Sequence, residues 1–121
     1  MHGFKGERTL MRIHVGEADR HGDVPLYQAI VELLRSRHLA GATVFRGVLG
    51  FGAHARLHED RGAFRLSSDL PIVVECVDTE EKIAEVLPEL DRMIGGGLVT
   101  LERARVILYR ADVSEAERTG S

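Results

Sequence analysis

Residues 71–94 read PIVVECVDTEEKIAEVLPELDRMI, and within this stretch the hydrophobic pattern changes its period. Residues 71–77 form a mostly apolar run with several β-branched side chains, which is typical of a buried central strand. The apolar positions then follow the period of a helix, at Ile83, Val86, Leu87, Leu90 and Ile94. The stretch therefore predicts a strand that leads directly into an amphipathic helix.

The ends and the middle of this helix carry separate signals. Asp78 or Thr79 suits the N-cap position, and the acidic residues that follow complement the positive end of the helix. Pro88 has no N–H to donate to Ala84, so we predict a kink, or a break with a second short helix from residue 88 to about residue 94. Three glycines at 95–97 then end the helix.

The flanking sequence supplies three more strands and one more helix. Residues 9–15 alternate as a half-buried strand does, and residues 42–49 and 98–109 are also predicted strands. A helix capped by Asp23 or Val24 has Pro25 in its first turn and ends at Gly41. Its apolar face is formed by Leu26, Ile30, Leu33 and Leu34. The order β-α-β, repeated once, predicts an α+β ferredoxin-like fold, an antiparallel four-stranded sheet with both helices on one face.

In such a sheet, this chain has no further helix to cover the second face. The strands contain apolar residues enough for both faces, among them Val44, Val48, Val73 and Cys76. An uncovered apolar sheet face predicts burial against other subunits.

Composition restricts the classes of protein to consider. The 121 residues include 44% hydrophobic and 29% charged residues, which suits a single globular domain with its core in residues 7–110 and flexible ends at 1–6 and 112–121. The net charge of −3 argues against nucleic acid as the main partner. With one cysteine, Cys76, an internal disulfide is excluded. No apolar run has the length of a membrane span and no signal peptide is recognised, so we expect a cytoplasmic protein.

Residues 42–64, ATVFRGVLGFGAHARLHEDRGAF, are the main functional signal. Three glycines follow an apolar strand within six residues, at Gly47, Gly50 and Gly52, and a cationic segment with Arg46, His54, Arg56, His58 and Arg61 surrounds and follows them. Glycine-rich turns present backbone N–H groups that bind anions, and arginines bind phosphate. Together with the glycines at 95–97, and with Arg103, Arg105 and Arg110 near the end of the last strand, they predict a site for a nucleotide-sized anion between subunits.

Three blocks of this sequence resemble the DUF190 group of PII-like proteins. They are ATVFRGVLGFG at 42–52, LPIVVECVDTEEKIAEVLPELD at 70–91 and MIGGGLVTLERARVI at 93–107, and the resemblance extends over residues 7–110. It implies a homotrimer with the sheets facing inward and clefts between subunits. In the wider PII superfamily those clefts bind adenine nucleotides, and a mobile loop engages a partner. That partner is often a membrane transporter or an enzyme, and the resemblance makes a fluoride-channel-type membrane protein one candidate.

The same resemblance assigns roles to individual residues. Residues 46–52 match the base of the mobile loop, residues 54–63 match the loop itself, and residues 95–97 match a turn that meets phosphates. Leu98 stands where PII proteins proper carry a lysine, and Arg110 stands alone where they carry a basic pair. The ligand-binding residues expected on these grounds are Arg46, Gly47, Gly50, Phe51, Gly52, Arg56, Gly95, Gly96, Gly97 and Arg110.

Two other classes of function stay open at this stage. A metal-binding trimer of the CutA type would use His54 and His58 as ligands. A small-molecule enzyme on a dimeric ferredoxin-like fold would need a polar residue on the sheet, for which Glu75 is the candidate. Catalysis by Cys76 is disfavoured, since a thiol within an apolar strand is usually inert. We therefore expect a non-enzymatic regulatory protein.

Overall fold

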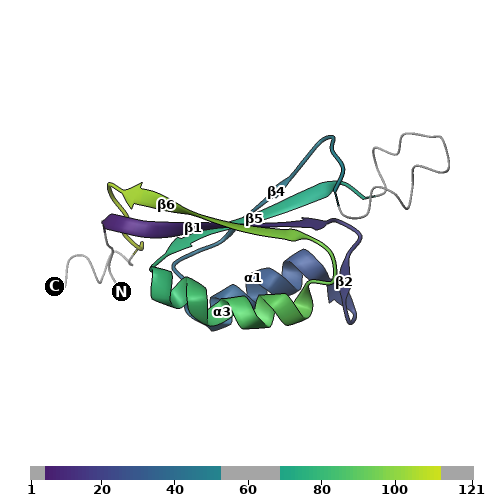
Figure 1. The fold of residues 1–121 in the computed structure, drawn as a ribbon, viewed down its shortest axis with the longest axis horizontal. Coiled ribbons are helices and arrows are strands. Elements are labelled where there is room, and N and C mark those ends of the chain that lie inside the picture. Colours follow the sequence, from purple (N-terminus) through teal and green to yellow (C-terminus); the bar gives the residue numbers. More distant parts are fainter. Residues whose placement is uncertain (1–4, 53–68, 113–121) are drawn as a thin grey trace.

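The computed structural model describes residues 5–52 and 69–112 of the chain. Four strands form one antiparallel sheet in the order β4-β5-β1-β6, and two helices lie together on one side of it (Figure 1). This arrangement confirms the α+β, ferredoxin-like prediction. The elements are β1 (Gly6–Gly16), β2 (Arg20–His21), β3 (Val24–Pro25), α1 (Leu26–Ser36), β4 (Thr43–Arg46), β5 (Pro71–Asp78), α3 (Glu80–Met93) and β6 (Leu98–Val106).

The core lies between the sheet and the two helices. Alternate residues of β1 and β5 point to the helices, because successive side chains of a strand alternate between faces. The helices contribute residues spaced three and four apart to this core, because such residues share one face of a helix. The buried apolar residues of these elements are Met11, Ile13, Val15, Leu26, Ile30, Leu34, Ile72, Val74, Cys76, Ile83, Val86 and Leu90.

Helix α3 begins as predicted but is not broken. The Thr79 hydroxyl oxygen accepts a hydrogen bond from the backbone N–H of Lys82 at 3.2 Å, which confirms Thr79 as the N-cap. The predicted break at Pro88 is wrong, because one helix runs from residue 80 to residue 93 through the proline. Val86 and Leu90, on either side of it, are both fully buried, and this packing holds the helix together across the missing hydrogen bond.

Helix α1 is shorter than predicted at both ends. Its N-cap is Pro25, with no side-chain hydrogen bond, instead of Asp23 or Val24. It ends at residue 36, so Gly41 is not its stop signal. His38 takes the left-handed conformation, with a φ of 64°, and turns the chain so that Leu39 enters the core.

The strand boundaries also differ from prediction. β1 begins at residue 6 instead of 9, and β6 ends at residue 106 instead of 109. β4 ends at residue 46 instead of 49, after which the N–H of Gly47 donates to the carbonyl of Pro71 at 2.7 Å. The small hairpin β2–β3 was not predicted; Gly22, with a φ of 62°, makes its turn.

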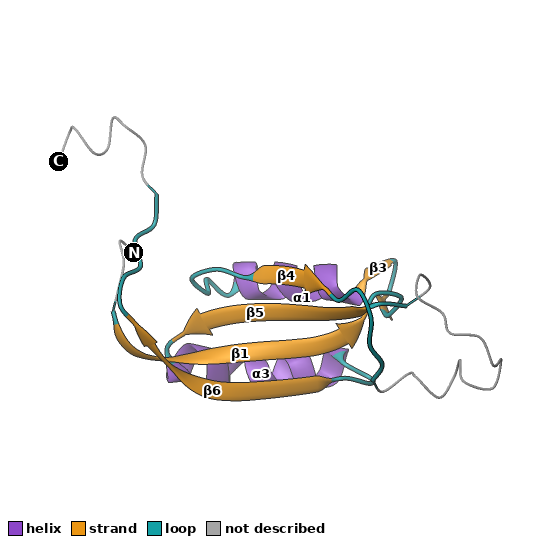
Figure 2. Ribbon diagram, turned by 90° about the horizontal axis from the view of Figure 1, so that it is seen from above, coloured by secondary structure: helices purple, strands orange, loops and turns teal. Residues whose placement is uncertain are grey.

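Both helices lie on one side of the sheet, and we call the opposite side the open face (Figure 2). The register places Val73 there, whereas Val44 and Cys76 face the helices, and Val48 lies beyond the end of β4. The centre of the open face is ionic, contrary to a purely apolar expectation. Arg12 donates to Glu75 at 2.8 Å and to Glu102 at 3.0 Å. Apolar side chains flank this group, among them Leu10, Phe45, Val73, Val77 and Leu98.

Candidate functional site

The topology brings two glycine-rich segments to the same end of the sheet. β1 and β4 end where β5 and β6 begin, because neighbouring strands are antiparallel. The register pairs His14 with Leu98 and Gly16 with Pro71 at this end. The chain that leaves β4 runs past the ends of β5 and β1 (Figure 2). Segments more than forty positions apart in the sequence therefore meet.

A cavity of about 310 Å³ lies where they meet, and we call it the glycine pocket. Its volume is at the lower end of the range for small-molecule sites. Five of the ten residues that the sequence predicted for ligand binding line it, from two separate turns. The lining residues are His14, Val15, Gly16, Gly50, Phe51, Gly52, Asp69, Pro71, Gly96, Gly97 and Leu98.

Two glycines at this end are required by the packing of the chain itself. A Cβ on Gly97 would lie 2.6 Å from the carbonyl oxygen of His14. A Cβ on Gly47 would lie 2.8 Å from Cγ of Pro71. Side chains at these positions would force the turns away from the strand ends. The packing of the chain therefore explains these two glycines without any ligand.

Gly52 and Gly95 differ from them, because a Cβ at either position would meet no atom of the described residues within 4 Å. Phe51 beside Gly52 is 88% exposed, so its ring has little packing within the chain. As far as the described residues go, the backbone at Gly52 and the ring of Phe51 beside it are therefore accessible to a ligand.

The electrostatics of the pocket depend on few side chains. His14 and Asp69 are the titratable residues in its described lining, and no lysine or arginine is among them. The Asp69 carboxylate accepts a hydrogen bond from the N–H of Ala18 at 2.9 Å, which fixes its position. Arg46 does not line the pocket and instead pairs with Glu17 at 2.7 Å. In this lining an anion would therefore meet backbone N–H groups and the His14 ring, with no lysine or arginine among the described residues.

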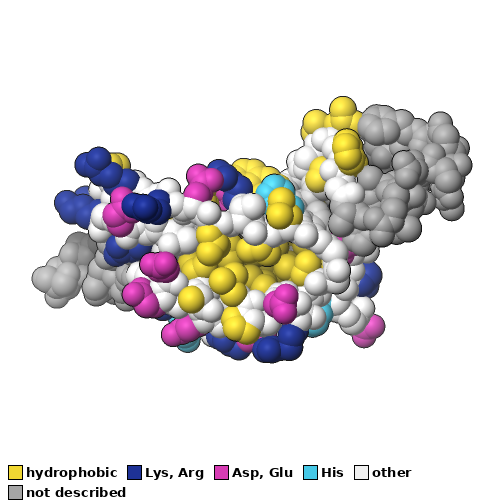
Figure 3. Space-filling view, in the orientation of Figure 1, with side chains coloured by type: hydrophobic (Ala, Val, Ile, Leu, Met, Phe, Trp, Pro, Cys, Tyr) yellow, Lys and Arg dark blue, Asp and Glu magenta, His cyan; other side chains and the backbone are white. Residues whose placement is uncertain are grey.

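The remaining predicted residues lie elsewhere. Arg110 follows the far end of β6, whose nine residues extend about 30 Å away from the pocket. Gly95 lines a neighbouring groove of about 590 Å³ between α3 and β6, together with Leu87, Leu90 and Val99. Hydrophobic side chains gather in the middle of this side of the molecule (Figure 3). Arg56 falls outside the described residues.

Sequence reasoning missed both titratable residues in the described lining of the pocket, His14 and Asp69. His14 is one polar residue in an alternating strand, and Asp69 precedes a strand as many turn residues do. Neither pattern distinguishes a pocket residue from an ordinary surface residue. The strand register locates both residues. It places His14 opposite the start of β6, and it places the start of β5, which Asp69 precedes, opposite the end of β1.

The other candidate chemistries are a metal site, a polar residue on the sheet and a reactive cysteine. Within residues 5–52 and 69–112, no three His, Cys, Asp or Glu side chains cluster as a metal site would require. His54 and His58 lie outside that part of the chain. Glu75 is paired with Arg12 on the open face. Burial raises the pKa of Cys76 to about 12, with a further contribution from the negative charge of Asp78, so the thiol is protonated at neutral pH.

These features define a ferredoxin-like protein with a pocket where two glycine-rich turns meet at one end of its sheet. The chain belongs to the DUF190 family, described as an uncharacterised group, whose model matches residues 8–106. In the described chain, no helix is long and apolar enough to cross a membrane.

Relatives in two organisms match this chain over nearly their whole length. A UPF0166 protein of Methanocaldococcus jannaschii is 35% identical over 107 residues, which cover 88% of this chain and 95% of that protein. A UPF0166 protein of Aquifex aeolicus is 39% identical over 84% of this chain and 94% of its own length. A second one from Aquifex aeolicus is 29% identical over 83% of this chain and 97% of its own. Their names state no activity.

Proposed function

We propose that this chain is a non-catalytic, PII-like regulatory protein that binds a small anionic ligand in the glycine pocket. An adenine nucleotide is the first candidate for that ligand. The observation that carries the proposal is that residues 50–52 and residues 96–97, both selected from the sequence as anion-binding turns, line one cavity. Membership of the DUF190 family supports the PII-like part of the proposal.

The lining residues suggest how such a ligand would be held. Phosphate oxygens would accept hydrogen bonds from the backbone of the glycine turns, which approach closely because they have no side chains. The exposed ring of Phe51 offers a surface on which a base can stack. Asp69 repels phosphate and would accept from a ribose hydroxyl or a base amino group instead. The ligand is thereby oriented with its negative end toward the glycines.

A homotrimer is part of the proposal. A phosphate group usually needs a cation, and the described lining of the pocket contains no lysine or arginine. Arg110 lies at the opposite end of the same chain, so only a neighbouring copy can bring it to the pocket. Burial of the open face between copies would also cover the apolar residues that flank Arg12.

Regulation would act through the segment that follows Gly52. A ligand that contacts Gly52 would favour some backbone conformations of the following segment over others. It would thereby shift the population of loop states. A coupling free energy of about 1–3 kcal/mol is enough for a useful switch. The partner that reads the loop would be an enzyme or a membrane transporter, with a fluoride-channel-type protein as one candidate.

Titration calorimetry with ATP, ADP, AMP and cyclic nucleotides tests the proposal. We expect Gly52→Val to abolish binding, because its side chain would extend into the pocket while meeting no atom of residues 5–52 and 69–112. Ala84→Val, which adds similar bulk at an exposed position of α3 outside both the pocket and the open face, is the control and should bind as wild type does. Undiminished affinity in Gly52→Val would remove the pocket as the site.

A thermal-shift screen with the same ligands supplies the independent readout. A ligand that binds the folded state must raise the melting temperature. If none of these nucleotides raises the melting temperature, the proposed ligand class is wrong, even if the chain forms the proposed trimer.

A further inference from the structure

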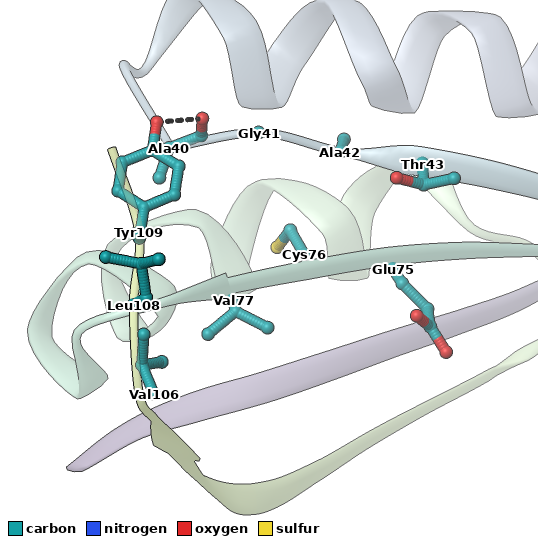
Figure 4. A pocket seen from close by; sticks show the side chains of 10 residues that line it. All are labelled: Ala40, Gly41, Ala42, Thr43, Glu75, Cys76, Val77, Val106, Leu108 and Tyr109. Carbon is teal, nitrogen blue, oxygen red and sulfur yellow. Dashed lines mark hydrogen bonds between the residues drawn. The ribbon is translucent and has the colours of Figure 1, made fainter. Parts of the chain in front are cut away.

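A second concavity lies at the opposite end of the sheet from the glycine pocket, and we call it the end hollow (Figure 4). Its volume is about 450 Å³. Small residues of the α1–β4 connection form one wall, and the end of β5 and the chain after β6 form the others. The lining residues are Ala40, Gly41, Ala42, Thr43, Glu75, Cys76, Val77, Val106, Leu108 and Tyr109.

The hollow exists because β4 is shorter than β5. The pairing between the two strands starts at Thr43 and Glu75, so the last three residues of β5 have no ladder partner on that side. The connection beside them is fixed instead by Asp78, whose carboxylate accepts from the N–H of Ala40 at 2.8 Å. The hydroxyl of Tyr109 donates to the carbonyl of Ala40 at 3.1 Å and closes the rim (Figure 4). These fixed walls make the hollow a built feature of the fold.

The chemistry of the hollow favours an apolar occupant. Val77, Val106 and Leu108 present aliphatic side chains to it. Glu75 is its one charged lining residue, and its carboxylate is already paired with Arg12 at 2.8 Å. The free energy of the system falls when apolar side chains displace water from such a concavity.

The chain carries a matching protrusion, residues 48–51, which we call the apolar turn. Val48, Leu49 and Phe51 are 86%, 57% and 88% exposed, respectively. Three large apolar side chains within four residues exceed the scattered exposure that is normal on a protein surface. Hydrophobic side chains are visible on this protruding end of the molecule in Figure 3.

The apolar turn cannot reach the end hollow of its own chain. The hollow lies before β4 and the turn lies after it, so the extended strand holds them apart. The four residues of β4, which extend about 13 Å, lie between them. Two complementary surfaces at different places on one chain produce a head-to-tail contact between copies, which closes into a ring when the rotation permits.

We propose that the end hollow of one copy receives the apolar turn of a second copy. This inference rests on the proposed assembly and specifies which residues join its subunits. Because Phe51 and Gly52 also line the glycine pocket, the pocket of one copy is directly attached to the hollow of the next. Tyr109 of that hollow precedes Arg110, so the contact also brings this arginine to the neighbour's pocket. Ligand bound at one site then alters the contact on which the next site depends, and the sites are coupled.

Crosslinking between two different single-cysteine variants tests the contact. A Val48→Cys chain is mixed with a Leu108→Cys chain, exchanged and oxidised, and the pair Leu49→Cys with Leu108→Cys is treated alike. The control pairs Val48→Cys with Val24→Cys, since Val24 is 39% exposed on β3 and lines neither cavity. Each variant is also oxidised alone, which measures the background of crosslinks between identical chains, including any through the native Cys76. We expect crosslinked pairs in the Leu108 mixtures at least tenfold more often than in the control.

A second measurement covers the case in which a cysteine pair has poor geometry. Leu49→Asp, which would place a carboxylate in the hollow, should weaken assembly at least tenfold, whereas Val24→Asp should not. If the wild type assembles, and neither the crosslinks nor Leu49→Asp exceeds its control, the contact is wrong and the assembly stands. If the wild type is monomeric, this contact and the proposed assembly both fail. If assembly is unaffected but an aliphatic probe such as hexane binds the hollow, the occupant is a small molecule and the proposal is overturned.

Discussion

The two faces of the sheet are built from the same strands and differ in almost every other respect. Toward the helices, Met11, Ile13 and Val74 are 0% exposed and pack only against other apolar side chains of the core. On the open face, Arg12 forms ion pairs with Glu75 and Glu102 among half-exposed apolar neighbours. The first face contains what a single chain needs to fold. The second carries apolar side chains that no other element of the described chain covers, and the proposed assembly would bury them.

Valines 73 and 74 allow the sharpest test of this difference, because they are adjacent residues of one type on opposite faces. We expect Val74→Asp to have the largest effect of any change considered. An unpaired carboxylate in the core costs about 3–5 kcal/mol, a large share of the stability of a domain of this size. Urea denaturation followed by circular dichroism measures the loss, and a transition like that of the wild type would contradict the assigned core.

Val73→Asp should instead leave the fold of the chain intact and disrupt its assembly. The new carboxylate can stay hydrated in a monomer, so we expect a change in the stability of the monomer within about 1 kcal/mol. On burial against another copy it has no partner. Light scattering reports the mass of the assembly, and an unchanged mass would show that the open face is not the interface.

Arg12→Ala sharpens the comparison within the open face. It leaves Glu75 and Glu102 close together without the cation that joins them. In a monomer solvent screens their repulsion, and in an assembly that excludes water it does not. We expect assembly to weaken less than in Val73→Asp, and to recover in part at high salt. Sedimentation at several salt concentrations checks this, with Glu32→Ala on the outer face of α1 as the control.

On the helix side, the cap of α3 should give a smaller effect. Thr79→Ala removes the hydroxyl that accepts from Lys82, and we expect a loss of about 1 kcal/mol. The matched control is Thr100→Ala, an exposed threonine of β6 on the open face, with no expected effect on chain stability. Urea titration of both variants in a monomeric background measures the difference. Equal losses would argue against the cap.

The smallest effect concerns Cys76 on the helix side. Because burial raises its pKa to about 12, from an ordinary value of 9.0, the folded state favours the protonated thiol. The stability from this preference is fully present below pH 9 and is lost as the pH rises toward 12. At pH 9.5 we expect a loss of less than about 1 kcal/mol relative to pH 8. Cys76→Ala should lack this dependence, and an identical pH profile in both proteins would refute the assignment.

The sequence predicted the helix-facing side well and the open face poorly. Periodicity locates the buried residues of β5 and α3, because a core imposes its spacing on the chain. It does not predict that α3 continues through Pro88, since this depends on the burial of Val86 and Leu90 by other elements. Nor does it predict that His38 takes a left-handed conformation, which allows Leu39 to reach the core.

The candidate site shows the same limit. Its glycines are visible in the sequence because they form clusters, and the topology places them around one pocket. His14 and Asp69 are single residues that only the register of β1 with its neighbours brings to it. Arg110 was assigned to the same site, but the length of β6 separates it from the pocket within one chain. The proposed assembly would join them, and the apolar strand pattern that predicts an assembly does not tell which residues of two copies meet.

Sedimentation equilibrium on the wild-type chain and on Val73→Asp tests most directly whether the open face is covered by further copies. The account predicts a wild-type particle of three chains of 13.4 kDa at micromolar concentration, and a single folded chain for Val73→Asp. A wild-type mass of 13.4 kDa under the same conditions would contradict it.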